Sequence, residues 1–151
     1  MKQSIILGVL LLATFAYAQK IPKGWQVIAD RTSMCQMAVP ADWTDSGIGT
    51  AMAPGGKARV GIHPNLRNDT WSHEQKTQKE GYARFKAFDQ SDKRLWYSTE
   101  PVHKPTHAKP VHWRITVPDV DGIGFCGAAI DIEDASLLPV ARKIAETVHV
   151  K

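Results

Sequence analysis

The sequence contains few cysteines: Cys35 and Cys126 are the only two among its 151 residues. Neither lies in a local signature of a cysteine hydrolase, which argues against a catalytic thiol. In an oxidising compartment, an even pair in a small domain usually forms a disulfide. We therefore expect a structural disulfide between Cys35 and Cys126, with two free buried thiols as the alternative. Closing so long a loop would stabilise the fold by about 4–5 kcal/mol in the chain-entropy model.

Beyond residue 18 the sequence has no apolar run long enough to span a membrane. At the start, Lys2 precedes an uncharged run from Ile5 to Ala18 that ends Ala16-Tyr17-Ala18. A basic start, a short apolar run and an A-x-A end are typical of a secretory signal peptide. The run has 14 residues, fewer than the ~20 of a membrane anchor, and no lipoprotein cysteine follows it. We predict a cleaved signal peptide over residues 1–18 and export to the periplasm or the extracellular space.

Internal repeats, low-complexity tracts and dense lysine–arginine runs are also missing. The remaining residues, 19–151, fit one domain that can bury a core. The absence of a basic run with interleaved aromatics argues against nucleic acid as a partner, as does export. Charge is uneven, however, with a net +6 over residues 57–114 and a net −3 over residues 115–151. This is either an ordinary mixed surface or a basic face for an anionic envelope component, such as a lipid headgroup, a cell-wall polymer or an acidic protein.

Alternating apolar and polar residues predict several short strands. We expect strands over 25–30, 34–39, 49–53, 58–63, 95–99, 111–117 and 123–132. Alternation is clearest at 58–63 and at VHWRITV (111–117). In the first of these, Ala58, Val60 and Ile62 belong to one face and Arg59, Gly61 and His63 to the other. In the second, Val111, Trp113, Ile115 and Val117 belong to the apolar face, whereas His112, Arg114 and Thr116 belong to the other face. IGFCGAAIDI is apolar on both faces, which is typical of a central strand.

Two segments predict amphipathic helices. The first runs from about Thr70 to Ala87, where Trp71, Tyr82 and Phe85 lie along one helical face. The second is SLLPVARKIAETVHV, which Ser136 can cap and in which Pro139 lies in the tolerated first turn. The predicted fold class is therefore α+β, a largely antiparallel sheet of about five to six strands with two amphipathic helices packed on it.

Three segments resemble the Mog1/PsbP-like group of α/β/α domains, which includes exported bacterial members such as DcrB. CQMAVPADW resembles the opening strand of the group, APGGKARVGIHP its next hairpin, and PVARKIAETVHVK its closing helix and tail. The resemblance implies an antiparallel central sheet. It also implies a binding or assembly role, since members of the group are mostly not enzymes. It implies no catalytic residues.

The segment PVHKPTHAKPVHW concentrates three histidines, His103, His107 and His112. Their spacing occurs in zinc proteins, and neutral imidazoles suit Zn²⁺ or Cu²⁺. Three prolines exclude a helix in this segment. The alternative is a solvated, basic, proline-stiffened loop. His63 and His73 are further ligand candidates from elsewhere in the chain.

Other motifs have simpler interpretations. GIGFCG is a literal G-x-G-x-x-G, but no strand precedes it and no helix follows, so we interpret its glycines as relieving crowding. Asp131 and Glu133 are either a general acid–base pair or acids that favour the following helix N-terminus, and we favour the second. Asp119-Val-Asp121-Gly lacks the remaining ligands of a calcium loop. Asn68 begins a glycosylation sequon.

The sequence contains five tryptophans. We expect Trp113 in the core and regard an exposed member of the set Trp25, Trp43, Trp71 and Trp96 as a candidate contact for a partner. No G-x-S-x-G motif supports serine catalysis, and we assign no catalytic residue and no cofactor beyond the Zn²⁺ or Cu²⁺ considered above. We expect a non-enzymatic binding or assembly module of the cell envelope. A metal-binding protein is the first alternative, and a small secreted hydrolase the second.

Overall fold

The computed structural model of the protein describes residues 21–65, 76, 82–101, 111–118 and 124–151. Within these residues the chain forms ten strands, two short 3-10 turns and one α-helix. The strands are β1 (Trp25–Ala29), β2 (Cys35–Pro40), β3 (Thr44–Asp45), β4 (Thr50–Met52), β5 (Ala58–Asn65), β6 (Tyr82–Ser91), β7 (Arg94–Pro101), β8 (Val111–Pro118), β9 (Phe125–Ile132) and β10 (His149–Val150). The turns are η1 (Pro54–Gly56) and η2 (Ala135–Leu137), and the helix is α2 (Leu138–Thr147).

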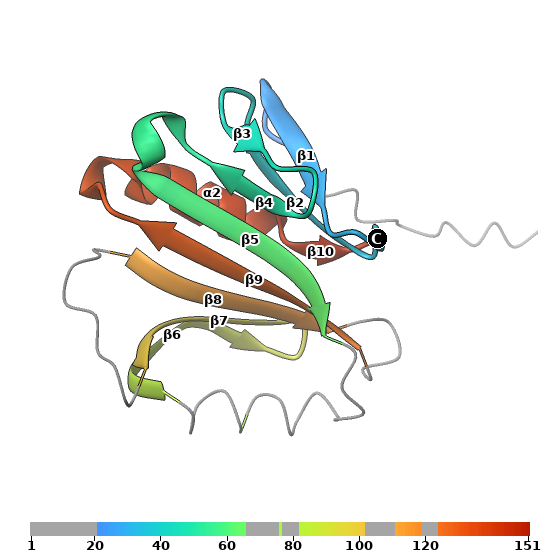
Figure 1. Cartoon of the computed structure of the whole chain (residues 1–151). Helices are drawn as coiled ribbons and strands as arrows, with labels where there is room; N and C mark the ends of the chain where they lie inside the picture. Colours follow the sequence, from blue (N-terminus) through green and yellow to red (C-terminus); the bar gives the residue numbers. More distant parts are fainter. Residues whose placement is uncertain (1–20, 66–75, 77–81, 102–110, 119–123) are drawn as a thin grey trace, which may run out of the picture.

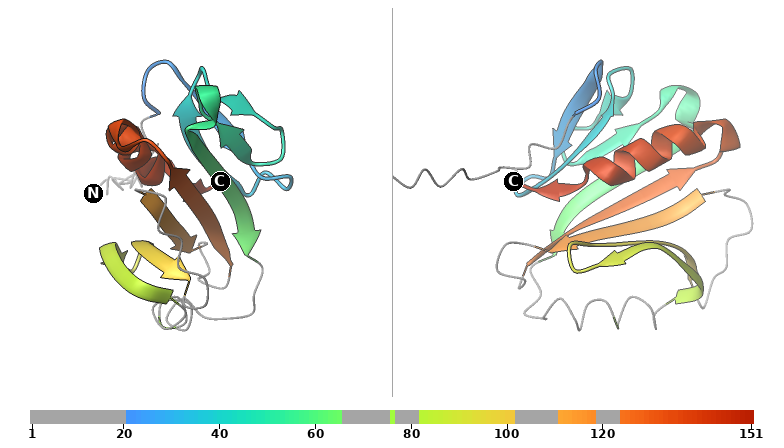
Figure 2. Two further views of the ribbon diagram at one scale, coloured as in Figure 1. Left: turned by 60° about the vertical axis from the view of Figure 1, so that its left-hand side comes forward. Right: turned by 180° about the vertical axis from the view of Figure 1, so that it is seen from behind.

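The strands form two sheets. Seven strands make an antiparallel sheet in the order β3-β4-β5-β9-β8-β7-β6, and three make a second sheet in the order β1-β2-β10. Helix α2 packs against β2 and β9 and lies across one face of the larger sheet, as the right-hand view of Figure 2 shows. Figure 1 looks onto the opposite face, where no described element lies in front of β5 and β9.

The core lies between the larger sheet, α2 and the smaller sheet. Alternation along the strands determines which side chains enter it. The predicted faces of the strands at 58–63 and 111–117 are confirmed. Nine core-facing residues of β5, β8 and β9 are at most 3% exposed: Ala58, Val60, Ile62, Trp113, Ile115, Cys126, Ala128, Ile130 and Ile132. Val117 packs against them and is partly buried. The apolar stripe of α2 closes the core through Ala141, Ile144 and Val148.

The two cysteines join the sheets, as predicted. Cys35 lies on β2 and Cys126 on β9, with their sulfur atoms at disulfide bonding distance and their Cα atoms 5.5 Å apart. Both residues are buried. The pair therefore connects the smaller sheet directly to the central strand of the larger one.

Arg94 holds the end of α2 against the β6–β7 hairpin. Its guanidinium donates hydrogen bonds to three carbonyl oxygens at the helix C-terminus, those of Ala145 (3.0 Å), Glu146 (3.2 Å) and Val148 (3.1 Å). These carbonyls have no partner within the helix, and they form its negative pole. One side chain thus satisfies three acceptors and places a positive charge where the helix dipole favours it.

The predicted fold class is wrong. The described chain is mostly β, with ten strands in two sheets and one α-helix, rather than two helices on a sheet of five or six strands. The error is clearest at the predicted helix Thr70–Ala87, because residues 82–87 belong to β6. Of the rest of that prediction, Lys76 alone lies within the described residues, and it is helical. Strands β3 and β10 were not predicted.

Two bulges explain why β6 did not look like a strand. The register between β6 and β7 shifts between Ala83 and Lys86 and again between Ala87 and Asp89. Each bulge inserts a residue and so interrupts the period of two that identifies a strand. The remaining apolar spacing then resembles that of a helix. Pairing with β7 over a long stretch of backbone outweighs this local preference.

Candidate functional site

Strand register gathers polar side chains on the sheet face opposite α2, which we call the polar face. Directly paired residues share a face. One such row crosses five strands, β3, β4, β5, β9 and β8, through Thr44, Met52, Arg59, Asp131 and His112. The next row contains Thr50, Gly61, Ala129 and Arg114. A third contains His63, Gly127 and Thr116. The second and third rows continue onto β7 through Tyr97 and Leu95, which are buried, so the polar groups of this face lie on β3, β4, β5, β9 and β8.

Small residues on the central strand leave room above the polar face. A Cβ atom added to Gly127 would lie 3.0 Å from His63 Nε2, so the imidazole ring rests directly on the glycine backbone. This contact supports the prediction that the glycines of GIGFCG relieve crowding, at least at Gly127. The exposed His63 ring is thereby held close to the sheet surface.

His112 and Asp131 interact directly on the polar face. His112 Nδ1 contacts Asp131 Oδ1 across the β8–β9 pair, and the two side chains are 20% and 25% exposed. The other ring nitrogen, Nε2, is buried and makes no hydrogen bond. The carboxylate thus orients the imidazole and occupies Nδ1, leaving Nε2 as the nitrogen that could take a further partner.

A cavity of about 440 Å³ opens at the β3–β4 end of the same face. Its lining combines hydroxyl groups, a few apolar side chains, a glycine turn and one charged side chain: Thr44, Ser46, Thr50, Ala51, Met52, Ala53, Pro54, Gly55, Gly56 and Arg59. Arg59 also belongs to the polar row, next to Asp131. The cavity and the polar row therefore form one continuous site that meets at Arg59.

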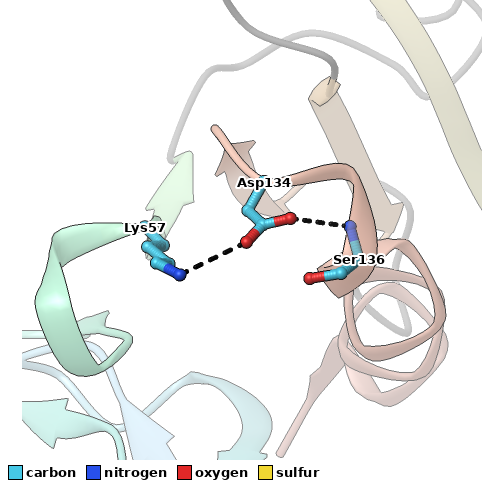
Figure 3. Close-up of polar contacts among 3 residues, drawn as sticks. All are labelled: Lys57, Asp134 and Ser136. Atoms are coloured by element: carbon cyan, nitrogen blue, oxygen red, sulfur yellow. Dashed lines mark hydrogen bonds and ion pairs between the residues drawn. The ribbon is translucent and has the colours of Figure 1, made fainter.

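The acids at the end of β9 and just after it have different roles. Asp131 pairs with His112, whereas Asp134 caps the turn η2 by accepting a hydrogen bond from the Ser136 amide at 2.9 Å. Figure 3 shows this cap together with Lys57, whose Nζ lies 3.5 Å from the other carboxylate oxygen. The Ser136 amide and hydroxyl, with Lys57 beside them, lower the pKa of Asp134. Asp134 thus caps η2. The prediction that Ser136 caps the closing helix is wrong, because the N-cap of α2 is Leu137 and no side chain caps it.

The predicted metal ligands fall only partly within the structure. His112 lies on β8 beside Asp131, whereas His73, His103 and His107 lie outside the described residues. Among the described residues, no group of three or more histidine, cysteine, aspartate or glutamate side chains is placed to hold a metal ion. His63 and His112 occupy different rows on strands separated by β9. Asn68, Asp119, Asp121 and Gly122 also lie outside the described part of the chain.

The described tryptophans do not form the exposed contact surface that we considered. Trp43, Trp96 and Trp113 are buried and Trp25 is half-buried, while Trp71 lies outside the described residues. Trp96 and Trp113 pack edge to face with centroids 5.1 Å apart, and Phe88 lies 5.2 Å from each. The Arg142 guanidinium from α2 covers this cluster, 5.7 Å from two of its rings.

Sequence reasoning missed the cavity residues. Arg59 was assigned to the solvent side of its strand, which is correct, but neither it nor the hydroxyl residues of the β3–β4 hairpin were considered as a site. The available signal was the position of Arg59 just after the glycine turn, on the exposed face of its strand. The sequence could not show which residues would align with Arg59. In the structure these are Thr44 and Met52 on one side and Asp131 and His112 on the other.

The described part of the chain contains no helix that is both long enough and apolar enough to cross a membrane. No protein-family model matches the chain, and no curated protein matches its sequence. The resemblance to the Mog1/PsbP-like group therefore stays a prediction, and the function has to be inferred from the site.

Proposed function

We propose that the protein is an exported, non-enzymatic binding domain of the cell envelope whose polar face binds an anionic component. The observation that supports this most directly is the register of β5, β9 and β8. It places Arg59, His63 and Arg114 on a single sheet face on which Asp131 is the one carboxylate among the three paired rows. Asp131 Oδ1 already contacts His112 Nδ1.

Charge and exposure on this face suit an anionic ligand. Arg59 and His63 are exposed and Arg114 is half-buried, so a ligand can reach the first two directly. Arginine binds carboxylate, phosphate and sulfate groups through parallel hydrogen bonds as well as through charge. Several such groups on one face attract a polymer more strongly than the same charges scattered over the surface.

Two features support an envelope location. The first 18 residues have the pattern of a secretory signal peptide, and Cys35 and Cys126 are placed as a disulfide pair, which persists in oxidising compartments. We also propose that the protein belongs to the Mog1/PsbP-like group, whose exported members include binding and assembly proteins.

The test is binding of dextran sulfate to residues 19–151, measured by calorimetry at low and at moderate salt. We expect the double variant Arg59→Gln/Arg114→Gln to weaken binding at least tenfold. The matched control Arg31→Gln/Lys143→Gln removes the same charge from exposed positions in the β1–β2 turn and on α2, and should change binding less than twofold. Equal weakening in both variants, or no binding by the unmodified chain, would refute the proposal.

A second candidate function is metal binding, and the orientation of His112 favours it. Histidine ligands of metals usually direct one ring nitrogen at a carboxylate, which fixes the ring and leaves the other nitrogen for the metal. His112 has this arrangement, with Nδ1 at Asp131 and Nε2 without a partner. The segment that leads into β8 supplies His103 and His107 in sequence, so a Zn²⁺ or Cu²⁺ site would use all three histidines.

Titration of residues 19–151 with Zn²⁺ and Cu²⁺, without a histidine tag, tests this candidate. Binding of one ion at micromolar affinity or tighter, lost in both His103→Ala/His107→Ala and His112→Ala, would support it. His63→Ala is the control that should retain binding. Weak binding that survives in the first two variants would eliminate the metal-binding function.

A further inference from the structure

We infer that the cavity beside Arg59 binds an acidic sugar, a saccharide unit carrying one carboxylate or phosphate group. This inference rests on the proposed function, because it names the chemistry of the anionic component that reaches the polar face. The volume of the cavity, about 440 Å³, falls within the roughly 300–1,000 Å³ of small-molecule sites. One or two sugar rings are of a suitable size.

The anionic group would be held by Arg59. Arg59 is the one charged side chain among the residues that line the cavity. No hydrogen bond or ion pair connects it to another residue in the described ranges, so its guanidinium donors remain open to a ligand. A planar guanidinium matches a carboxylate or phosphate with two parallel hydrogen bonds. With a single cation in the lining, the cavity suits one anionic group rather than a chain of phosphates.

The sugar hydroxyls would meet the hydroxyls of the β3–β4 hairpin. Thr44, Ser46 and Thr50 all line the cavity. Ser46 Oγ already bonds to the Thr50 hydroxyl and, at 3.0 Å, to the Thr50 carbonyl oxygen, which fixes the two side chains in place. A hydroxyl has one donor and two acceptor positions, so each retains capacity for a ligand. Sugar hydroxyls offer the complementary donors and acceptors.

The rest of the lining suits the flat, less polar face of a sugar ring. Met52 is 45% exposed and lies directly opposite Arg59 in the β4–β5 pair, and Pro54 contributes a second apolar surface. Gly55 and Gly56 both have φ near +71°, and an added Cβ would meet nothing within 4 Å at either position. Their backbone is therefore accessible to a ligand that approaches the turn.

The experiment titrates residues 19–151 with glucuronate, glucose 6-phosphate, glucose and inorganic phosphate, followed by backbone amide NMR shifts. We expect saturable binding of glucuronate or glucose 6-phosphate at millimolar affinity or tighter, with shifts centred on residues 44–59. Glucose and phosphate should each bind at least tenfold more weakly. Whichever acidic sugar binds more tightly identifies the anionic group as carboxylate or phosphate.

Two variants and a control connect the binding to the cavity. Arg59→Gln should reduce acidic-sugar binding at least tenfold, and Met52→Glu should do the same by placing a carboxylate opposite Arg59. Both positions are exposed, so amide spectra can verify that the fold is intact. Lys143→Gln removes a charge from an exposed position on α2, on the other side of the sheet, and should change sugar binding less than twofold.

Three outcomes would overturn the inference. Phosphate binding as tightly as glucose 6-phosphate would indicate a simple anion site. Binding unchanged by Arg59→Gln would place the ligand elsewhere. Absence of sugar binding, while dextran sulfate still binds through Arg59 and Arg114, would reject the acidic-sugar site and leave the proposed function standing. Loss of both kinds of binding would reject both.

Discussion

Replacing Gly49 by alanine tests the contact between the two sheets next to the cavity. Gly49 lies in the β3–β4 hairpin with φ +79°. A Cβ there would lie 2.7 Å from the Ile62 carbonyl oxygen, 3.0 Å from Asp30 Cα and 3.2 Å from the Ala29 carbonyl oxygen. All three are backbone atoms, of β5 and of the end of β1, so none can move aside as a flexible side chain would. In addition, the Ile62 amide donates a 2.7 Å hydrogen bond to the Gly49 carbonyl oxygen.

Gly47, in the same hairpin, provides the matched control. Its φ is +74°, but nothing lies within 4 Å of an added Cβ. Gly47→Ala should therefore lower the free energy of unfolding by only about 1–2 kcal/mol, the cost of a left-handed conformation for alanine. Gly49→Ala should cost that amount plus roughly 1–3 kcal/mol for forcing the backbones apart. Its total loss of unfolding free energy should be about 2–5 kcal/mol.

Urea denaturation of oxidised residues 19–151, followed by circular dichroism at 25 °C, measures both losses. The difference between the two variants isolates the steric contribution, because both share the positive φ. Equal losses would mean that β1 and β5 separate at no cost and that Gly49 does not fix the hairpin. A destabilised but folded Gly49→Ala should also bind dextran sulfate less tightly if the hairpin positions the cavity.

Three further predictions concern stability. The double variant Cys35→Ser/Cys126→Ser should have a free energy of unfolding about 3–5 kcal/mol lower, measured by urea denaturation. A loss below about 1 kcal/mol would contradict a disulfide that constrains the unfolded chain. Burial alone would raise the pKa of Asp30, but hydrogen bonds from Thr32 and from nearby backbone amides lower it overall. The resulting stabilisation is present above the ordinary pKa of 3.8 and is lost as the pH falls through the lowered folded value. Asp30→Asn should therefore cost about 1–3 kcal/mol at pH 7 and flatten the stability profile between pH 2 and 4, and an unchanged profile would contradict this. Arg94→Met should lower the free energy of unfolding by about 2–3 kcal/mol, because it leaves the helix carbonyls without their donor. A thermal unfolding midpoint equal to that of the unmodified chain would show that water replaces the guanidinium as donor.

Local patterns predicted most of the strands and the closing helix. Alternation is strong at 58–63 and 111–117, and the core contains the predicted residues Ala58, Val60, Ile62, Trp113 and Ile115. The helix α2 was visible because its stripe has a period of 3.6 and Pro139 lies in its first turn. β6 was misassigned because its bulges interrupt the alternation, and no local feature reveals the pairing with β7 that makes it a strand. The two-residue strands β3 and β10 are too short to have a period at all.

The candidate site was predictable only in its parts. His112, Arg114 and Arg59 were assigned to polar faces of their strands, and those assignments are confirmed. The site itself depends on β5 and β8 pairing with opposite edges of β9, which brings together residues more than 50 positions apart in sequence. Non-local pairing of this kind leaves no trace in the composition of either strand. The cavity depends in addition on β3 and β4 extending the sheet beyond β5.

Two contacts explain why Asp131, rather than another residue of β9, lies between Arg59 and His112. The bond of Cys126 to Cys35 requires Cys126 to face the core, and alternation then directs Asp131 to the polar face. A slip of two residues would preserve the faces but place a different residue of β9 beneath the His63 ring. Only glycine fits there without moving that ring, since even a Cβ at Gly127 would lie 3.0 Å from its Nε2. The disulfide thus selects the face, and Gly127 lets the His63 ring lie against the sheet in the register that aligns the polar row.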